Sequence, residues 1–254
     1  MAELVSSREL LYTLVERQLR LRAKRSLLGV AWPTIAPLFL LGLYAFVFQG
    51  VFHAPIERYP LYLFIGLLPW TFVAQSLGHA ITSLSHDAEL IRRTPFPQEL
   101  LPMAAVISLA VYFLTTLVGL LIFLAVRGDL EYRILPMLLL PVGALLLFVT
   151  GIAMVLALID VFNHDLRFLL GNLLTIWFFL VPIVYRPEMV GGALDILRYV
   201  DPANLIVAQF RDILFYHHLS SPSHVVLMVG ICAGFFVACL AGFRRCSTQL
   251  AKDI

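Results

Sequence analysis

The sequence predicts an all-α integral membrane protein with six transmembrane helices, an N-terminal amphipathic interface helix, and short outer re-entrant helices between spans five and six. Among its 254 residues, 61% are hydrophobic, only 13% are charged, and the mean hydropathy is +0.91. Soluble domains average about 45–50% apolar and about 25% charged residues, so we expect lipid to be the main solvent. The net charge of +2 is too small to indicate a nucleic-acid partner.

Six stretches of the chain lack Asp, Glu, Lys and Arg and are candidates for membrane spans. A helix needs about 20 apolar residues to cross a hydrocarbon core of about 30 Å. The six stretches are Ser26–Ile56, Tyr59–His86, Leu100–Val126, Ile134–Ile159, Phe168–Tyr185 and Ile213–Phe243. We predict one span in each, although the fifth stretch is short and contains Pro182.

The distribution of cations predicts the orientation of these spans. With the N-terminus in the cytoplasm, 12 of the 18 Lys and Arg residues lie in the inner segments and 6 lie in the outer ones. Cytoplasmic segments of membrane proteins carry such an excess of cations. The bias is strongest before the first span, and with six spans it predicts that both termini are cytoplasmic.

Residues 1–25 predict an amphipathic helix that lies on the cytoplasmic surface of the membrane. Its apolar face consists of Leu10, Leu11, Leu14, Val15 and Leu21. The cations toward its end suit anionic lipid headgroups, and they are Arg17, Arg20, Arg22, Lys24 and Arg25. The alternative is a plain positively charged segment that only directs insertion.

The longest segment outside the spans is the outer segment 186–222. Its hydrophobic residues recur at helical spacing on both sides of Pro202. We predict two short helices there that dip against the outer leaflet.

The spans offer little chemistry that could drive transport. Proton-coupled carriers use ionisable groups at membrane depth, whereas here only Asp160 and His79 lie near the inner ends of spans. A nucleotide-binding P-loop needs a Gly-Lys-Ser/Thr sequence, but Lys24 and Lys252 both follow alanine. We therefore expect no ATP site, no catalytic residues and no metal site in this chain, and an energy source in another polypeptide.

Four motifs occur in order along the chain. The run RAKRSLLGVAW from Arg22 to Trp32 opens the first span, and LIRRTPFPQELLP begins at Leu90 between spans two and three. Asn163-His164-Asp165 follows the fourth span. The fourth motif joins VPIVY at 181–185, Asp201-Pro202 and Phe210-Arg211-Asp212.

Through these motifs the chain resembles the permease subunits of ABC-2 type polysaccharide exporters, which export O-antigen, capsule and teichoic acid. The resemblance implies a bacterial cytoplasmic (inner) membrane protein that forms a homodimer. It also implies two copies of a separate ATPase subunit that binds ATP and Mg, and a lipid-linked glycan as substrate. Four positions depart from the family pattern, namely Ala23, His164, Val181 and Asp201.

The resemblance also implies roles for particular residues. The cytoplasmic loop 84–100 would carry the helix that couples to the ATPase, through Leu90, Ile91, Arg92, Arg93, Phe96, Pro97 and Glu99. Interface residues beside the lipid headgroups would be Arg22, Arg25, Ser26, Gly29 and Trp32. The outer segment would depend on Pro182, Tyr185 and Arg211, with Arg211 either packing helices or lying near the exiting chain.

A glycan path needs aromatic rings, because the C–H faces of sugars stack on them. Candidates within the spans are Tyr44, Trp70, Tyr112 and Trp177. Three other functions stay open: an exporter of a drug or small lipid, a membrane enzyme acting on lipid-linked sugars, and a passive scaffold. The enzyme is disfavoured, because no paired acid/base motif is present.

Overall fold

The computed structural model describes the chain in four main ranges. Described are residues 2–24, 58–87, 89, 96–186 and 200–253, together with positions 39, 42–43 and 46. Its description of side chains starts at Arg8 and ends at Ser247. The first predicted span, Ser26–Ile56, therefore lies almost wholly outside the described residues.

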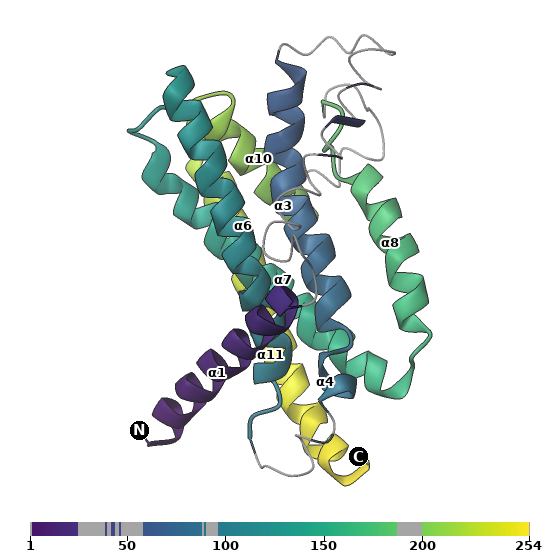
Figure 1. The fold of residues 1–254 in the computed structure, drawn as a ribbon. Coiled ribbons are helices and arrows are strands. Elements are labelled where there is room, and N and C mark those ends of the chain that lie inside the picture. Colours follow the sequence, from purple (N-terminus) through teal and green to yellow (C-terminus); the bar gives the residue numbers. More distant parts are fainter. Residues whose placement is uncertain are drawn as a thin grey trace.

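The described residues form a helical bundle (Figure 1). Its helices are α1 Ala2–Lys24, α3 Tyr59–Ala80, α4 Ser83–His86, α6 Leu100–Arg127, α7 Leu139–Phe162, α8 Leu166–Leu180, α10 Pro202–Leu214 and α11 Pro222–Asp253, with a 3-10 turn, η2, at Leu135–Leu138. Both chain termini lie at one end of the bundle, which we call the terminal end, and α10 lies near the opposite, far end (Figure 1).

Four of these helices are long and apolar enough to cross a membrane: α3, α6, η2 with α7, and α11 as far as Ser247. They confirm the second, third, fourth and sixth predicted spans. The sixth stretch, Ile213–Phe243, contains most of its span but also the end of another helix. Ile213 and Leu214 end α10, and α11 starts at Pro222, so a charge-free stretch does not reveal the turn between two apolar helices.

Helix α3 is the centre of the bundle and contacts α6, α7, α8 and α10. Most of its side chains are buried, and Pro60 in its first turn removes an N–H that would have had no helical partner. In contrast, α11 packs mainly on α7, and only 11% of its most apolar 18-residue stretch is buried. Such exposed apolar surface suits a lipid solvent.

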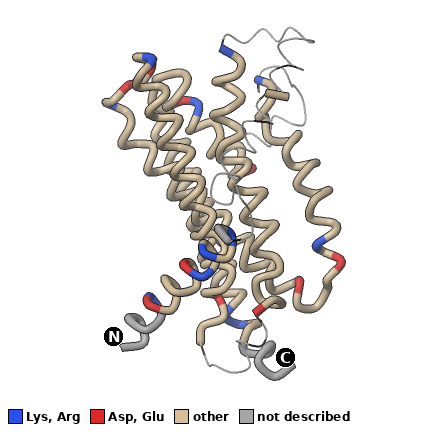
Figure 2. Tube along the Cα trace, in the orientation of Figure 1, with Lys and Arg blue, Asp and Glu red and all other residues tan. Residues whose placement is uncertain are grey.

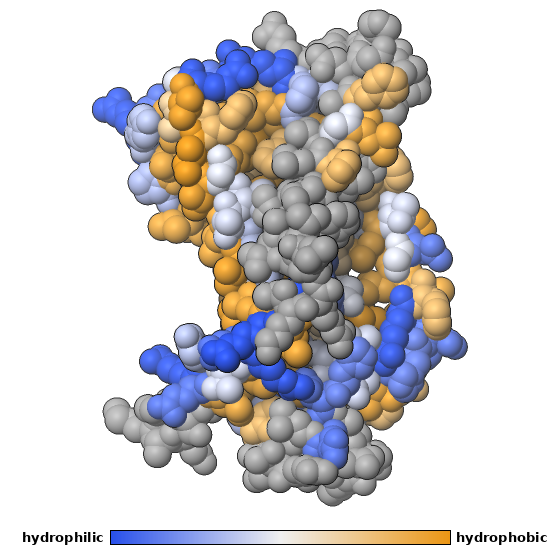
Figure 3. Space-filling view, in the orientation of Figure 1, coloured by the Kyte–Doolittle hydropathy of each residue, from blue (hydrophilic) through white to orange (hydrophobic). Residues whose placement is uncertain are grey.

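Charged residues are scarce along the middle of the bundle and gather toward its two ends (Figure 2). The space-filling view likewise shows hydrophilic residues near both ends and hydrophobic surface between them (Figure 3). This distribution is expected where helices cross a hydrocarbon layer between two aqueous phases.

Helix α8 is the short fifth apolar segment. Its 15 residues rise about 22 Å, less than a hydrocarbon core of about 30 Å. The helix ends at Val181, whose backbone is extended, and α10 begins after the N-cap residue Asp201. Helix α10 covers the second hydrophobic run of the outer segment 186–222, and the first run lies almost wholly outside the described residues. That these segments dip against the outer leaflet stays a prediction.

Candidate functional site

The terminal end of the bundle gathers segments from five helices around one apolar cluster, which we call the terminal cluster. Its buried members are Leu14, Leu84, Leu100, Leu101, Ala104, Met154, Ala157 and Phe243. Phe96, from the predicted coupling loop, packs against this cluster. Leu90, Ile91, Arg92 and Arg93 of the same loop lie outside the described residues.

Three polar links join the flanks of the predicted coupling loop to three different helices. The links are Arg17 Nη1 to Asp87 Oδ1 at 2.9 Å, Ser85 Oγ to Asp160 Oδ2 at 2.5 Å, and Arg244 Nε to Glu99 Oε1 at 3.0 Å. Their partners belong to α1, α7 and α11 respectively. A displacement of the loop would therefore reach three helices at once.

Asp160 is fully buried, yet its carboxylate has several donors. The guanidinium of Arg167 donates to it through Nε at 2.5 Å and Nη2 at 2.7 Å, in addition to the bond from Ser85. A buried carboxylate persists only when it is paired in this way. Asp160 therefore fixes the corner between α7 and α8.

Helix α1 uses its apolar face against the protein. Leu14 is buried in the terminal cluster, and Leu10, Leu11 and Val15 pack against it, whereas Leu21 is exposed. Four of the five residues predicted for this face thus contact the protein, a partner that sequence periodicity did not indicate. That α1 lies on the membrane surface stays a prediction.

Further along α1, Ser108 of α6 donates a 3.2 Å hydrogen bond to Gln18. Arg22, in the last turn of α1, is half-buried, and burial lowers the pKa of its guanidinium. The other predicted interface residues, Arg25, Ser26, Gly29 and Trp32, lie outside the described residues.

At the far end, Arg211 of α10 holds the backbone that follows α8. Its side chain is only 3% exposed. Nη1 donates to the carbonyl oxygen of Pro182 at 2.5 Å, and Nη2 donates to that of Ile183 at 2.6 Å. The guanidinium carbon also lies 3.7 Å from the ring centroid of Tyr62. Arg211 of α10 thus contacts both α3 and the backbone that follows α8.

Two tyrosines of α3 complete this arrangement. The hydroxyl of Tyr59 donates to the carbonyl of Val184 at 2.9 Å, and that of Tyr62 donates to the carbonyl of Tyr185 at 3.0 Å. Four consecutive carbonyls, from Pro182 to Tyr185, therefore each have a side-chain donor. We call Arg211, Tyr59 and Tyr62 the carbonyl clamp. Sequence reasoning missed both tyrosines, because their acceptors are backbone atoms with no sequence signature.

Asp201 links α10 to α8. One carboxylate oxygen accepts from the backbone N–H of Ala203 at 3.0 Å, which makes Asp201 a helix N-cap. The other accepts from the indole N–H of Trp177 at 3.0 Å. Burial raises the pKa of this carboxyl, although both hydrogen bonds favour its charged form.

Of the aromatic residues considered for a glycan path, Trp70 and Trp177 pack against each other. Their ring centroids are 5.5 Å apart in an edge-on arrangement, and Trp70 is only 7% exposed. Trp70 also contacts Phe178, so these rings join α3 to α8 in this conformation. Tyr44 lies outside the described residues.

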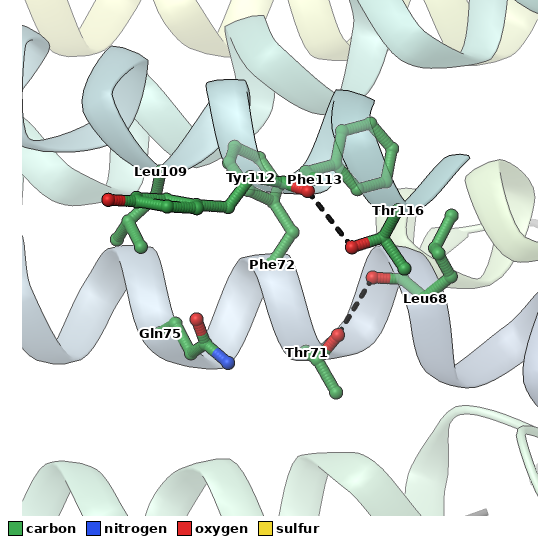
Figure 4. Close-up of a pocket in the computed structure, with 8 residues that line it drawn as sticks. All are labelled: Leu68, Thr71, Phe72, Gln75, Leu109, Tyr112, Phe113 and Thr116. Atoms are coloured by element: carbon green, nitrogen blue, oxygen red, sulfur yellow. Dashed lines mark hydrogen bonds between the residues drawn. The ribbon is translucent and has the colours of Figure 1, made fainter. Parts of the chain in front are cut away.

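Tyr112 lines a small pocket between α3 and α6, beside Thr71, Gln75 and Thr116 (Figure 4). The hydroxyls of Thr71 and Thr116 are bonded to carbonyls of their own helices. The pocket has a volume of about 20 Å³. Such a volume holds about one water and is too small for a sugar ring.

Comparison with known proteins supports the resemblance seen in the sequence. The O-antigen export system permease protein RfbA of Myxococcus xanthus is 27% identical to this chain over 256 residues, which cover 99% of this chain and 98% of that protein. Two Klebsiella pneumoniae proteins of the same name are each 26% identical to this chain. The first alignment covers 81% of this chain and 80% of the relative, and the second covers 84% of this chain and 84% of the relative. Residues 9–215 match the family model described as ABC-2 type transporter. This match spans more than half of the chain, and the chain therefore belongs to the ABC-2 type transporter family.

Proposed function

We propose that the chain is the membrane-spanning permease subunit of an ATP-driven exporter. Its cargo is a lipid-linked polysaccharide, O-antigen or a similar cell-surface glycan, which crosses the cytoplasmic membrane. The observation that carries this proposal is the likeness to an O-antigen export permease over 99% of this chain and 98% of that protein. The separate ATPase subunit binds ATP and Mg and performs the hydrolysis.

In this proposal the terminal end faces the cytoplasm, and two permease chains and two ATPase copies form the exporter. Exposed apolar side chains on α8 are available for contact with the second permease chain or with lipid, since Phe168, Leu173 and Ile176 are 81%, 53% and 59% exposed.

The coupling loop 84–100 transmits the ATPase movement to the spans. Its described residues support this role, because Phe96 packs on the terminal cluster and the three polar links tie the flanks of the loop to α1, α7 and α11. Energetic coupling between distant sites travels through such contiguous packed elements. The Trp70–Trp177 contact would have to open for these rings to face a glycan.

The test is export in a strain that lacks its own permease and receives this chain with its ATPase. The wild-type chain restores surface glycan, while a chain with Phe96→Ala and Pro97→Ala inserts normally but exports at background level. Phe162→Ala, a 67% exposed aromatic residue at the same end, is the matched control and exports normally. Full export by the double variant contradicts the coupling role, and export of a small lipid without glycan contradicts the substrate.

A further inference from the structure

A cavity of about 530 Å³ lies between α3 and α6 at the far end of the bundle. Its walls are mainly apolar, from Leu61 and Phe64 on α3 and from Leu120 and Phe123 on α6. Specific small-molecule sites occupy about 300–1,000 Å³, so the volume is that of a ligand site. The walls offer few hydrogen-bonding groups, which disfavours a sugar and favours a hydrocarbon chain.

The mouth of the cavity carries two cations and one anion. Arg58 Nη1 lies 3.1 Å from Oδ1 of Asp129, and Arg127 Nε lies 3.6 Å from Oδ2 of the same residue. Both arginine side chains are more than half exposed, whereas that of Asp129 is 19% exposed. Two guanidinium groups share one carboxylate, so these three lining residues keep a net positive charge that faces outward.

The backbone fixes these three residues in place. Arg58 adopts a left-handed conformation with φ of 52°, which is uncommon for a residue other than glycine. On the other side, Gly128 ends α6 with φ of 72°, and the N–H of Asp129 returns to the carbonyl of Leu124 at 2.9 Å. This helix-ending motif sets the carboxylate between the two arginines.

The depth of the cavity matches one leaflet of a bilayer. Its lining on α6 runs from Thr115 to Arg127, and twelve residue steps of helix rise about 18 Å. Half of a hydrocarbon core of about 30 Å is close to this length. The arginines therefore lie at the level of lipid headgroups, with the apolar walls beside the acyl chains.

We propose that this cavity binds one anionic phospholipid, with an acyl chain between α3 and α6 and its phosphate on Arg58 and Arg127. A lipid with a net negative charge complements the excess cation, whereas a zwitterionic lipid brings its own cation to the same place. A polyprenyl carrier is much longer than the depth of about 18 Å, so this cavity would hold only part of it. With the terminal end in the cytoplasm, the leaflet beside this cavity is the outer one, and only that assignment rests on the proposed function.

The test measures lipids retained by the full-length chain in mild detergent, by native mass spectrometry, after addition of phosphatidylglycerol or phosphatidylcholine. Arg58→Gln and Arg127→Gln should each lower phosphatidylglycerol retention about fivefold, as expected for one cation near a lipid surface. Gly119→Leu should also lower it, because Gly119 lines the cavity, a Cβ there meets nothing within 4 Å, and the larger side chain takes up cavity volume.

Two matched controls should retain the lipid: Arg133→Gln, an exposed cation at the same end, and Gly143→Leu on α7, whose Cβ also meets open space. Equal retention of phosphatidylglycerol by the wild type and the cavity variants would overturn the proposal. Equal retention of phosphatidylcholine, or preferential retention of a polyprenyl phosphate, would also overturn it. Binding is measured without transport, so a chain that retains the lipid but exports no glycan contradicts the proposed function alone.

Discussion

Arg211 shows how one side chain can supply hydrogen-bond donors to the backbone that follows a short apolar helix. The last helical hydrogen bond of α8 runs from the backbone N–H of Val181 to the backbone carbonyl of Trp177. The carbonyls that follow would cost several kcal/mol each if they faced lipid without a donor. A guanidinium donates in a fork, so a single Arg211 serves both Pro182 and Ile183.

Two replacements of Arg211 should therefore destabilise the protein to different degrees. Arg211→Lys keeps the charge but not the fork, and leaves one carbonyl unpaired at a cost of about 1–3 kcal/mol. Arg211→Met leaves both carbonyls unpaired and should cost about twice as much. The measurement is the thermal unfolding of the detergent-purified chain, with Arg133→Lys as an exposed control. An Arg211→Met chain as stable as the wild type would contradict the carbonyl clamp.

Gly66 gives an independent check on the same clamp. A Cβ added at Gly66 would lie 2.8 Å from Nη2 of Arg211, too close for a normal contact. Gly66→Ala should therefore push the guanidinium from its carbonyls and lower the unfolding temperature. Gly78→Ala, on the same helix with nothing within 4 Å, should change stability little or raise it. Equal effects of the two substitutions would show that Arg211 can move freely.

Asp201 predicts a pH dependence at the same end. Burial raises the pKa of its carboxyl, so the folded state binds the proton more tightly than the unfolded state. The stability that Asp201 contributes is therefore highest at low pH and falls as pH rises from its ordinary pKa through the raised one. Asp201→Asn removes this dependence. Between pH 4 and pH 7 the wild type should therefore lose stability relative to the variant. A constant difference contradicts the prediction.

At the scale of helices, the Glu99–Arg244 pair links the coupling loop to α11. The Arg244 side chain is 64% exposed, so its ion pair should add only about 0–1 kcal/mol to stability. Its proposed role is instead to connect the coupling loop to α11. Exchanging the residues, as Glu99→Arg with Arg244→Glu, should restore the export that either single reversal lowers.

The matched control for that exchange is Glu16→Gln. It breaks the Glu16–Arg20 pair, which lies within α1 and links no two elements. The readouts are glycan export and ATPase activity in the assembled exporter. If the double variant inserts normally but does not recover export, this ion pair has no role in coupling.

Most helices could be predicted from the sequence, because apolar length alone identifies a membrane helix. Periodicity also found α1 and α10. The packing partners could not be predicted in this way. The apolar face of α1 fits a membrane surface as well as it fits the terminal cluster, and the acceptors of Arg211 are carbonyls present at every residue. Asp160 was noted from the sequence only as an ionisable residue near the inner end of a span, because the turn that brings Arg167 back to it has no sequence signature.

At the scale of the whole molecule, both chain ends lie at the terminal end, together with the described part of the coupling loop (Figure 1). The prediction that this end is cytoplasmic rests on 12 cations against 6. A permease whose ATPase is a separate subunit must present its coupling loop to the compartment that holds ATP. The orientation therefore decides whether the proposed mechanism is possible.

Cys246 offers a natural probe of this orientation. It is exposed near the end of α11, whereas Cys232 is buried and Cys239 partly buried. A membrane-impermeant maleimide should label Cys246 in inside-out vesicles and not in intact spheroplasts. Arg133→Cys, at the far end, should show the reverse pattern once Cys246 is replaced by serine. Labelling of Cys246 from outside the cell would place the coupling loop away from ATP and would remove the basis for an ATP-driven exporter.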